Sequence, residues 1–106
     1  MDIADWRKQI DEIDRKLVEL LNRRAQAAHE IGKLKRQAGM AIYEPDRERS
    51  VFANATGANQ GPLPNLDLMR IYERIMDIMR KIQQEEIAPA EDTVTHDTEL
   101  DSDVND

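Results

Sequence analysis

The sequence of 106 residues is long enough for one domain and contains no cysteine, so it can form neither a disulfide framework nor a thiolate metal site. Its formal net charge is −7, but seven of the 22 acidic residues and none of the 15 basic residues follow residue 87. Residues 1–87 are therefore neutral, and a neutral body beside an acidic tail argues against nucleic acid as the main partner.

The two ends of the chain bear on where the protein works. The N-terminal segment MDIADWRKQIDEIDRK is charged from its second residue, unlike a signal peptide, and no stretch approaches the ~18 apolar residues of a membrane span. We therefore expect a cytoplasmic protein without a membrane anchor. Residues 88–106 have few apolar residues and no aromatic one, so we expect an acidic disordered tail after a helical domain of residues 1–87.

The first predicted element is a helix of ~37 residues, which would be about 55 Å long. Between Asp2 and Ala38 the sequence has no proline and a single glycine, Gly32. Asp2 suits the N-cap, and Gly39 suits the left-handed residue that ends many helices. Apolar side chains recur at spacings of three and four residues, which is typical of a helix with one covered face. They are Ile3, Trp6, Ile10, Ile13, Leu17, Leu20, Leu21, Ala28, Ile31 and Leu34.

Two shorter helices are expected next, so the predicted fold class is all-α with three helices. Pro45 favours the first turn of a helix, which should run through DRERSVFANA and stop near Gly57. The segment GANQGPLP has the glycines and prolines of a loop. Asn65 or Asp67 would cap a third helix that ends before Pro89. Its apolar residues are Leu68, Ile71, Tyr72, Ile75, Met76, Ile78, Met79 and Ile82.

The length of the first helix has a consequence for assembly. A compact domain of about 90 residues has a radius of gyration of only ~12 Å, and two shorter helices cannot cover an apolar stripe of ~55 Å. The stripe also has heptad-like spacing. We therefore expect an intertwined helical homodimer. The alternative is an antiparallel bundle in which the first helix is broken near Gly32.

Two cations on the first helix share a face. Arg24 and Lys35 are eleven residues apart, which places them within ~20° of one direction and ~16 Å apart along the axis. Ala28 and Ile31 lie between them, so a small molecule with two carboxylates would suit this face; the alternative is a solvated face without a ligand. Arg7 is ~25 Å from Arg24 along the axis, so it could join such a site only from a partner chain.

The run WRKQIDEIDRKLVELLNRRAQAAHEIGKLKRQAGMAIYEPDRER resembles the N-terminal half of the all-helical (AroQ-class) chorismate mutases. The shared pattern is an early arginine, Ile-Asp a few residues later, LLxRR, IGxxK and then Tyr-acid-Pro-x-Arg-Glu. Each piece is weak, but the order and spacing are specific, and the resemblance extends over roughly residues 3–86. It implies an interlaced dimer of three-helix chains with two equivalent sites. The implied reaction is the Claisen rearrangement of chorismate to prephenate, in phenylalanine and tyrosine biosynthesis.

The resemblance also implies roles for residues that match the family pattern. Arg7 would bind one substrate carboxylate in the other subunit's site, and Arg24 would bind the second carboxylate. Lys35 and the amide of Gln83 would both donate to the ether oxygen of the substrate. Gln84 is the alternative to Gln83 if the register differs by one residue. The reaction is unimolecular, so it requires no nucleophile, cofactor or metal.

A second group of residues would surround the ring of the substrate. By the same resemblance, Glu48 would accept a hydrogen bond from the ring hydroxyl, with Glu44 and Arg47 beside it. The sequence departs from the pattern at Met79, where some family members have a small hydroxyl residue. That position would either lose a polar contact with the substrate or simply pack.

Two other functions are compatible with the same helices. One is a lyase of the same fold that splits pyruvate from isochorismate, because fold alone does not decide the reaction. The other is a non-catalytic helical dimerisation or regulatory module with a degenerate pocket. Such a module need not retain the whole set of polar residues named above, and this chain has all of them, so we favour the mutase.

Overall fold

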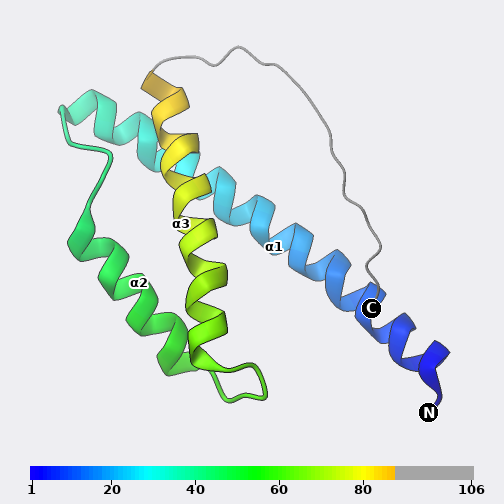
Figure 1. Ribbon diagram of the computed structural model, residues 1–106. Helices are drawn as coiled ribbons and strands as arrows, with labels where there is room; N and C mark the ends of the chain where they lie inside the picture. Colours follow the sequence, from blue (N-terminus) through cyan, green and yellow to red (C-terminus); the bar gives the residue numbers. More distant parts are fainter. Residues whose placement is uncertain (88–106) are drawn as a thin grey trace.

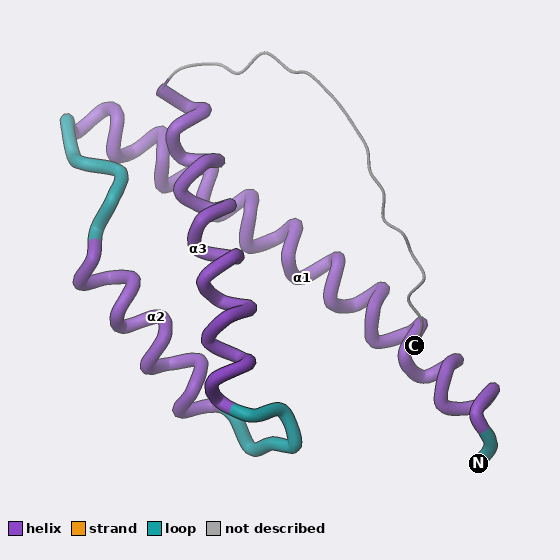
Figure 2. The backbone as a smooth tube through the Cα atoms, in the orientation of Figure 1, coloured by secondary structure: helices purple, strands orange, loops and turns teal. Residues whose placement is uncertain are grey.

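The structure is a computed structural model that describes residues 1–87 as three helices (Figure 1). These are α1 (Ile3–Ala38), α2 (Pro45–Ala58) and α3 (Asn65–Ile87), and no strand occurs within the described residues (Figure 2). The predicted all-α fold of three helices is confirmed. None of these described helices has the length and apolar content needed to cross a membrane. The predicted acidic tail, residues 88–106, lies outside the described part of the chain.

The long helix α1 is continuous over 36 residues, so the alternative of a break near Gly32 is wrong. Asp2 caps its N-terminus as predicted: the Asp2 carboxylate accepts from the Asp5 backbone N–H at 2.9 Å. The Asp5 carboxylate accepts from the Asp2 N–H at 3.2 Å in return. Gly39 ends the helix with a left-handed φ of +70°, also as predicted. Both ends therefore pair backbone groups that a bare helix terminus leaves without partners.

The start of α2 agrees with the sequence, but the start of α3 does not. α2 begins at Pro45 and ends at Ala58, one residue past the predicted stop. α3 begins at Asn65 itself, and the Pro64 carbonyl accepts the first hydrogen bond, from the Leu68 N–H at 3.0 Å. The prediction that Asn65 or Asp67 caps this helix is therefore wrong.

The loop before α3 explains the difference, because Asn59 organises it. The Asn59 side-chain amide donates to the Leu63 carbonyl and to Oδ1 of Asn65, both at 2.7 Å. The Asn59 side-chain oxygen accepts from the Gly61 N–H at 3.0 Å. The side chain of Asn65 thus closes the loop instead of capping the helix that follows.

The three helices meet around a small core. α3 packs against the C-terminal half of α1 and also against α2 (Figure 1). The buried apolar residues of this core are Ala28, Val51, Met76 and Met79. The first 23 residues, in contrast, are all exposed, because this part of α1 projects beyond α3 (Figure 1). The radius of gyration is 16.7 Å, well above the ~12 Å of a compact domain of this length.

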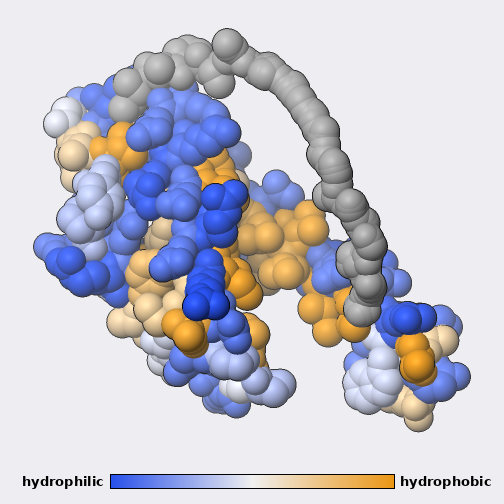
Figure 3. Space-filling model, viewed as in Figure 1, coloured by the Kyte–Doolittle hydropathy of each residue, from blue (hydrophilic) through white to orange (hydrophobic). Residues whose placement is uncertain are grey.

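The projecting part of α1 carries large apolar side chains on its surface (Figure 3). Trp6 is 54% exposed, Ile13 58% and Leu17 49%. A contiguous apolar surface of this kind is typical of an interface with another chain. This exposure agrees with the expected homodimer, which itself remains a prediction. The exposed apolar residues of this segment are Ile3, Trp6, Ile10, Ile13, Leu17, Val18, Leu20 and Leu21.

The left-handed conformation of Gly39 gives a first prediction. Gly39→Ala should lower the free energy of unfolding by about 1–2 kcal/mol, because a Cβ disfavours positive φ. Gly57→Ala is the matched control, since Gly57 lies inside α2 with no atom within 4 Å of an added Cβ. The control should gain up to ~1 kcal/mol from helix propensity. Urea unfolding followed by circular dichroism at equal protein concentrations measures the stability of both variants. Equal stabilities would contradict the left-handed conformation of Gly39.

Candidate active site

A cavity of about 480 Å³ lies between the C-terminal half of α1, the start of α2 and α3. Its volume is in the range of small-molecule sites. Six of the seven site residues predicted from the sequence line it: Arg24, Lys35, Glu44, Arg47, Glu48 and Gln83. Apolar side chains fill the wall between them. They include Ala28, Ile31, Val51, Met76 and Met79.

The α1 wall of the cavity has the arrangement that helical spacing predicted. Arg24 and Lys35 both line the cavity, and Ala28 and Ile31 lie between them in the sequence and line it too. Ala28 is buried and small, whereas Ile31 keeps 45% of its surface exposed. The wall thus offers two cations with an apolar patch between them, which suits a small molecule with two carboxylates.

Lys35 is the buried charge of the site, with only 6% of its surface exposed. Its Nζ donates to the Ile42 carbonyl at 2.8 Å and to Oε1 of Gln83 at 2.9 Å. It also forms an ion pair with Glu44, with 2.8 Å between Nζ and Oε1. Because a buried ammonium is costly without partners, these three acceptors offset the cost of its burial and fix its position. They also tie the end of α1 to the α1–α2 connection and to α3.

Gln83 faces the cavity, and its neighbour Gln84 is exposed. The structure therefore favours Gln83 over Gln84 as the amide at the site. An ammonium can only donate, so the Lys35 contact places the amide oxygen of Gln83 on the lysine side. The amide NH₂ is then the group that Gln83 can offer to a ligand.

Arg80 on α3 also lines the cavity, although it was not among the site residues predicted from the sequence. Its Nε donates to Oε2 of Glu48 at 2.6 Å, and its Nη2 donates to Oδ1 of Asp77 at 2.7 Å. The guanidinium also lies 5.5 Å from the centre of the Tyr43 ring. The hydrogen bond to Glu48 and then that to Asp77 raise the pKa of Arg80 above its usual value, so Arg80 stays charged.

A signal for Arg80 was present in the sequence. Arg80 lies three residues before Gln83, so the two side chains fall near the same face of a helix. On this helix the family pattern drew attention to Met79 and Gln83, with Gln84 as the alternative to Gln83. Met79 is in fact buried and forms part of the cavity wall, so it packs at this position.

The structure separates two neighbours at the start of α2. Glu48 is half-buried and paired with Arg80 across the cavity. Arg47 is exposed at the rim, where its Nη1 donates to the Ser50 hydroxyl at 3.3 Å. The expected role of Glu48 as acceptor of a ligand hydroxyl therefore concerns a carboxylate that already accepts one hydrogen bond from a cation.

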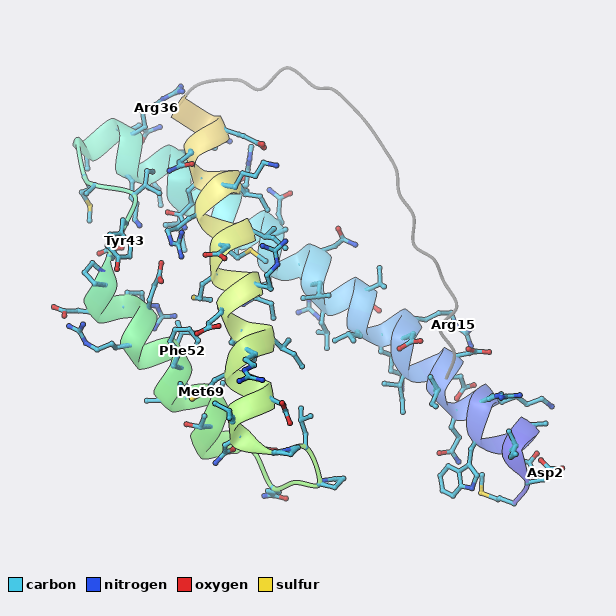
Figure 4. All side chains as sticks on the ribbon, viewed as in Figure 1. Asp2, Arg15, Arg36, Tyr43, Phe52 and Met69 are labelled. Carbon is cyan, nitrogen blue, oxygen red and sulfur yellow. The ribbon has the colours of Figure 1, made fainter. Side chains whose placement is uncertain are left out.

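Arg7 is the predicted site residue that is not among those lining this chain's cavity. It lies on the projecting part of α1 and is exposed. Asp2 and Arg15, which flank it in the sequence, lie far from Tyr43 beside the cavity (Figure 4). This agrees with the geometric expectation that Arg7 cannot reach the site of its own chain.

The chemical capacity of the cavity follows from its polar groups. Arginine and lysine side chains can hold carboxylates, an amide and an ammonium can stabilise charge on one oxygen, and a carboxylate can accept from a hydroxyl. Among the side chains that the structure describes, no three histidine or carboxylate groups lie close enough together to hold a metal ion. Fold and cavity together define a three-helix protein whose pocket suits a small anion bearing a hydroxyl group.

Comparison with known proteins identifies the family. The sequence model of the type II chorismate mutases matches residues 6–84. The chain therefore belongs to the chorismate mutase type II family, as the sequence motifs indicated.

Several curated relatives are longer than this chain. A bifunctional chorismate mutase/prephenate dehydratase of Neisseria gonorrhoeae is 43% identical over 70 residues, which are 66% of this chain and 19% of the relative. One from Aquifex aeolicus is 34% identical over 107 residues, covering 93% of this chain and 29% of the relative. This chain thus spans less than a third of either protein. A chorismate mutase of Methanocaldococcus jannaschii is 38% identical over 50 residues, covering 47% of this chain and 50% of that protein.

Solved structures of similar size share the fold. A chorismate mutase of Thermus thermophilus superimposes with a TM-score of 0.77 at 28% identity, covering 79% of this chain and 96% of that one. A chorismate mutase of Helicobacter pylori in complex with prephenate gives a TM-score of 0.74 at 26% identity, covering 84% of this chain and 97% of that one.

The ion pair between Arg80 and Glu48 gives a second prediction. Arg80→Gln should lower the free energy of unfolding by about 1–3 kcal/mol, because it leaves a half-buried carboxylate without its cation. Arg74→Gln, on the same helix, is the control: Arg74 is 76% exposed and its nitrogen is 3.9 Å from Asp77. That change should cost no more than about 0.5 kcal/mol. Urea unfolding measures both, and similar losses would contradict a structural role for the Arg80 pair.

Proposed function

We propose that this chain is a chorismate mutase, which converts chorismate to prephenate in the biosynthesis of phenylalanine and tyrosine. The observation that carries the proposal is the contact between the Lys35 ammonium and the Gln83 amide in a cavity that Arg24 also lines. Family membership over residues 6–84 and the prephenate complex of a similar structure support it. The sequence has no cysteine, which suits the reducing cytoplasm in which we place the enzyme.

The reaction is an intramolecular rearrangement in which an ether C–O bond breaks as a C–C bond forms. No atom enters or leaves, so the enzyme needs no nucleophile, acid–base pair or cofactor. Its first task is to hold the flexible enolpyruvyl arm over the ring in a reactive geometry. Arg24 would bind one substrate carboxylate. Arg47 at the rim would attract the substrate, whose two carboxylates make it a dianion.

The second task is electrostatic. Negative charge grows on the ether oxygen as its bond to the ring breaks, and donors aimed at that oxygen lower the barrier. Gln83 accepts from Lys35 through its amide oxygen, so its NH₂ is left to donate to the ether oxygen. Lys35 has three protons and three acceptors, so it would donate to the same oxygen by giving up one of them, such as the Glu44 carboxylate. Donors of this kind are worth about 3–4 kcal/mol each.

The ring end of the substrate would meet Glu48. Its carboxylate is oriented by Arg80 at 2.6 Å and would accept a hydrogen bond from the ring hydroxyl. Glu44 lies beside this group and forms an ion pair with the Lys35 ammonium. Met79 supplies an apolar wall, so this pocket holds the substrate with one polar group fewer than family members that have a hydroxyl there.

The proposal includes a homodimer with shared sites. A second α1 packed along the exposed apolar stripe would cover side chains such as Trp6 and Leu17, which this chain leaves in water. Arg7 lies seventeen residues before Arg24 on a straight helix, about 25 Å away, so it is out of reach within one chain. In a crossed dimer it would bind the second carboxylate in the partner's cavity.

Turnover of chorismate tests the function directly. The purified chain should form prephenate without added metal or cofactor. Lys35→Met should lower kcat by at least about a hundredfold, because it removes the charged donor but keeps the side-chain length. Lys33→Met, at an exposed site two residues away, is the matched control and should change kcat less than twofold.

Two outcomes would contradict the proposal. Turnover no faster than the spontaneous rearrangement would exclude catalysis and favour a binding or dimerisation module. Release of pyruvate from isochorismate, with no prephenate from chorismate, would favour the lyase. Similar losses of kcat in Lys35→Met and Lys33→Met would show that Lys35 has no specific role in the site.

Subunit complementation tests the shared site. Arg7→Ala and Arg24→Ala homodimers should each be nearly inactive, whereas mixing them should restore activity, because one of the two sites in a mixed dimer retains both arginines. The maximum is about a quarter of wild-type activity at equal mixing. Subunit exchange is followed separately by fluorescence transfer. Exchange without recovered activity would contradict the crossed arrangement.

A further inference from the structure

The helices α1 and α3 approach each other very closely at Gly32. A Cβ added at Gly32 would lie 2.9 Å from Cα of Gln83, 3.1 Å from its carbonyl oxygen and 3.2 Å from its Cβ. Two of these three atoms belong to the backbone of α3. No flexible side-chain tip can move aside to make room, so any side chain at Gly32 would force one helix away from the other.

The other three glycines of the chain do not share this property. An added Cβ at Gly39, Gly57 or Gly61 would meet nothing within 4 Å. Glycine is a poor helix former, so it is unfavourable inside a helix unless something else requires it. At Gly32 the requirement is the contact with Gln83, and the position is buried against α3.

The residue that Gly32 meets is the one whose amide faces the cavity. Lys35 lies one turn after Gly32 on α1 and donates to Oε1 of Gln83 at 2.9 Å. Relief of the 2.9 Å contact to an ordinary 3.4 Å requires a shift of about 0.5 Å between the helices. That is the tolerance within which catalytic groups must be held, and it would lengthen the Lys35–Gln83 hydrogen bond directly.

We propose that Gly32 is a positioning residue of the active site. Its missing side chain sets the separation of α1 and α3 at Gln83, so that the Gln83 amide and the Lys35 ammonium converge on the same substrate oxygen. This inference rests on the proposed mutase function. A glycine that served only packing would affect stability but leave kcat of the folded enzyme unchanged.

A double-mutant cycle separates these two roles. Gly32→Ala should lower kcat at least tenfold and change KM less than threefold, because Arg24 and the apolar wall still bind the substrate. Gln83→Ala should lower kcat further, and the double variant should be about as slow as Gln83→Ala alone, since no amide is left to misplace. Gly57→Ala should retain wild-type kcat. Losses that multiply in the double variant, or an unchanged kcat in Gly32→Ala, would overturn the inference.

Folding is checked by circular dichroism before each assay. If Gly32→Ala is unfolded in buffer, the assays are repeated in trimethylamine N-oxide, which favours compact states. A variant that stays unfolded there would contradict a positioning role, because Gly32 would then be required for folding as a whole.

Absence of chorismate turnover by the wild-type chain would refute the proposed function. The contact between Gly32 and Gln83 would then be tested by NMR. The side-chain amide signals of Gln83, assigned from their loss in Gln83→Ala, should shift in Gly32→Ala and not in Gly57→Ala. Unchanged signals in Gly32→Ala would overturn the positioning role independently of any activity.

Discussion

The arrangement of the site depends on one buried ammonium. Lys35 has three protons and meets three acceptors, one from the α1–α2 connection, one just before α2 and one from α3. Without these acceptors the charge could not be buried, and without the charge three polar groups would lose a partner. The same interaction therefore joins the helices and orients the amide of Gln83, so fold and site are stabilised together.

Local rules in the sequence predicted most of the helix boundaries. Asp2, Gly39 and Pro45 each act through their own backbone or a neighbour within one turn, so their effect can be read without knowing the fold. Asn65 failed for the opposite reason. Its side chain is engaged by Asn59 six residues earlier, and the hydrogen bond exists only once the loop has closed.

The site shows the same division. The spacing of Arg24 and Lys35 on one helix, together with the family motifs, predicted six residues that line the cavity. Arg80 and Gly32 were not predicted as site residues, because their importance lies in contacts between helices. Arg80 matters through Glu48, 32 residues away, and Gly32 through the backbone of Gln83. Periodicity within a helix gives a direction for each side chain but not the element that it will meet.

The position of Gln83 near the end of α3 has its own consequence. α3 is described as far as Ile87, so Gln83 lies one turn before the end of the described helix. Helix ends fray, and the final turn is the least stabilised by hydrogen bonds within the helix. The amide is therefore kept in place by lateral contacts, the Lys35 hydrogen bond and the close packing at Gly32, rather than by the helix beyond it. Opening of the last turn of α3 would leave Gln83 anchored to α1, so the site resists the fraying of the helix that carries it.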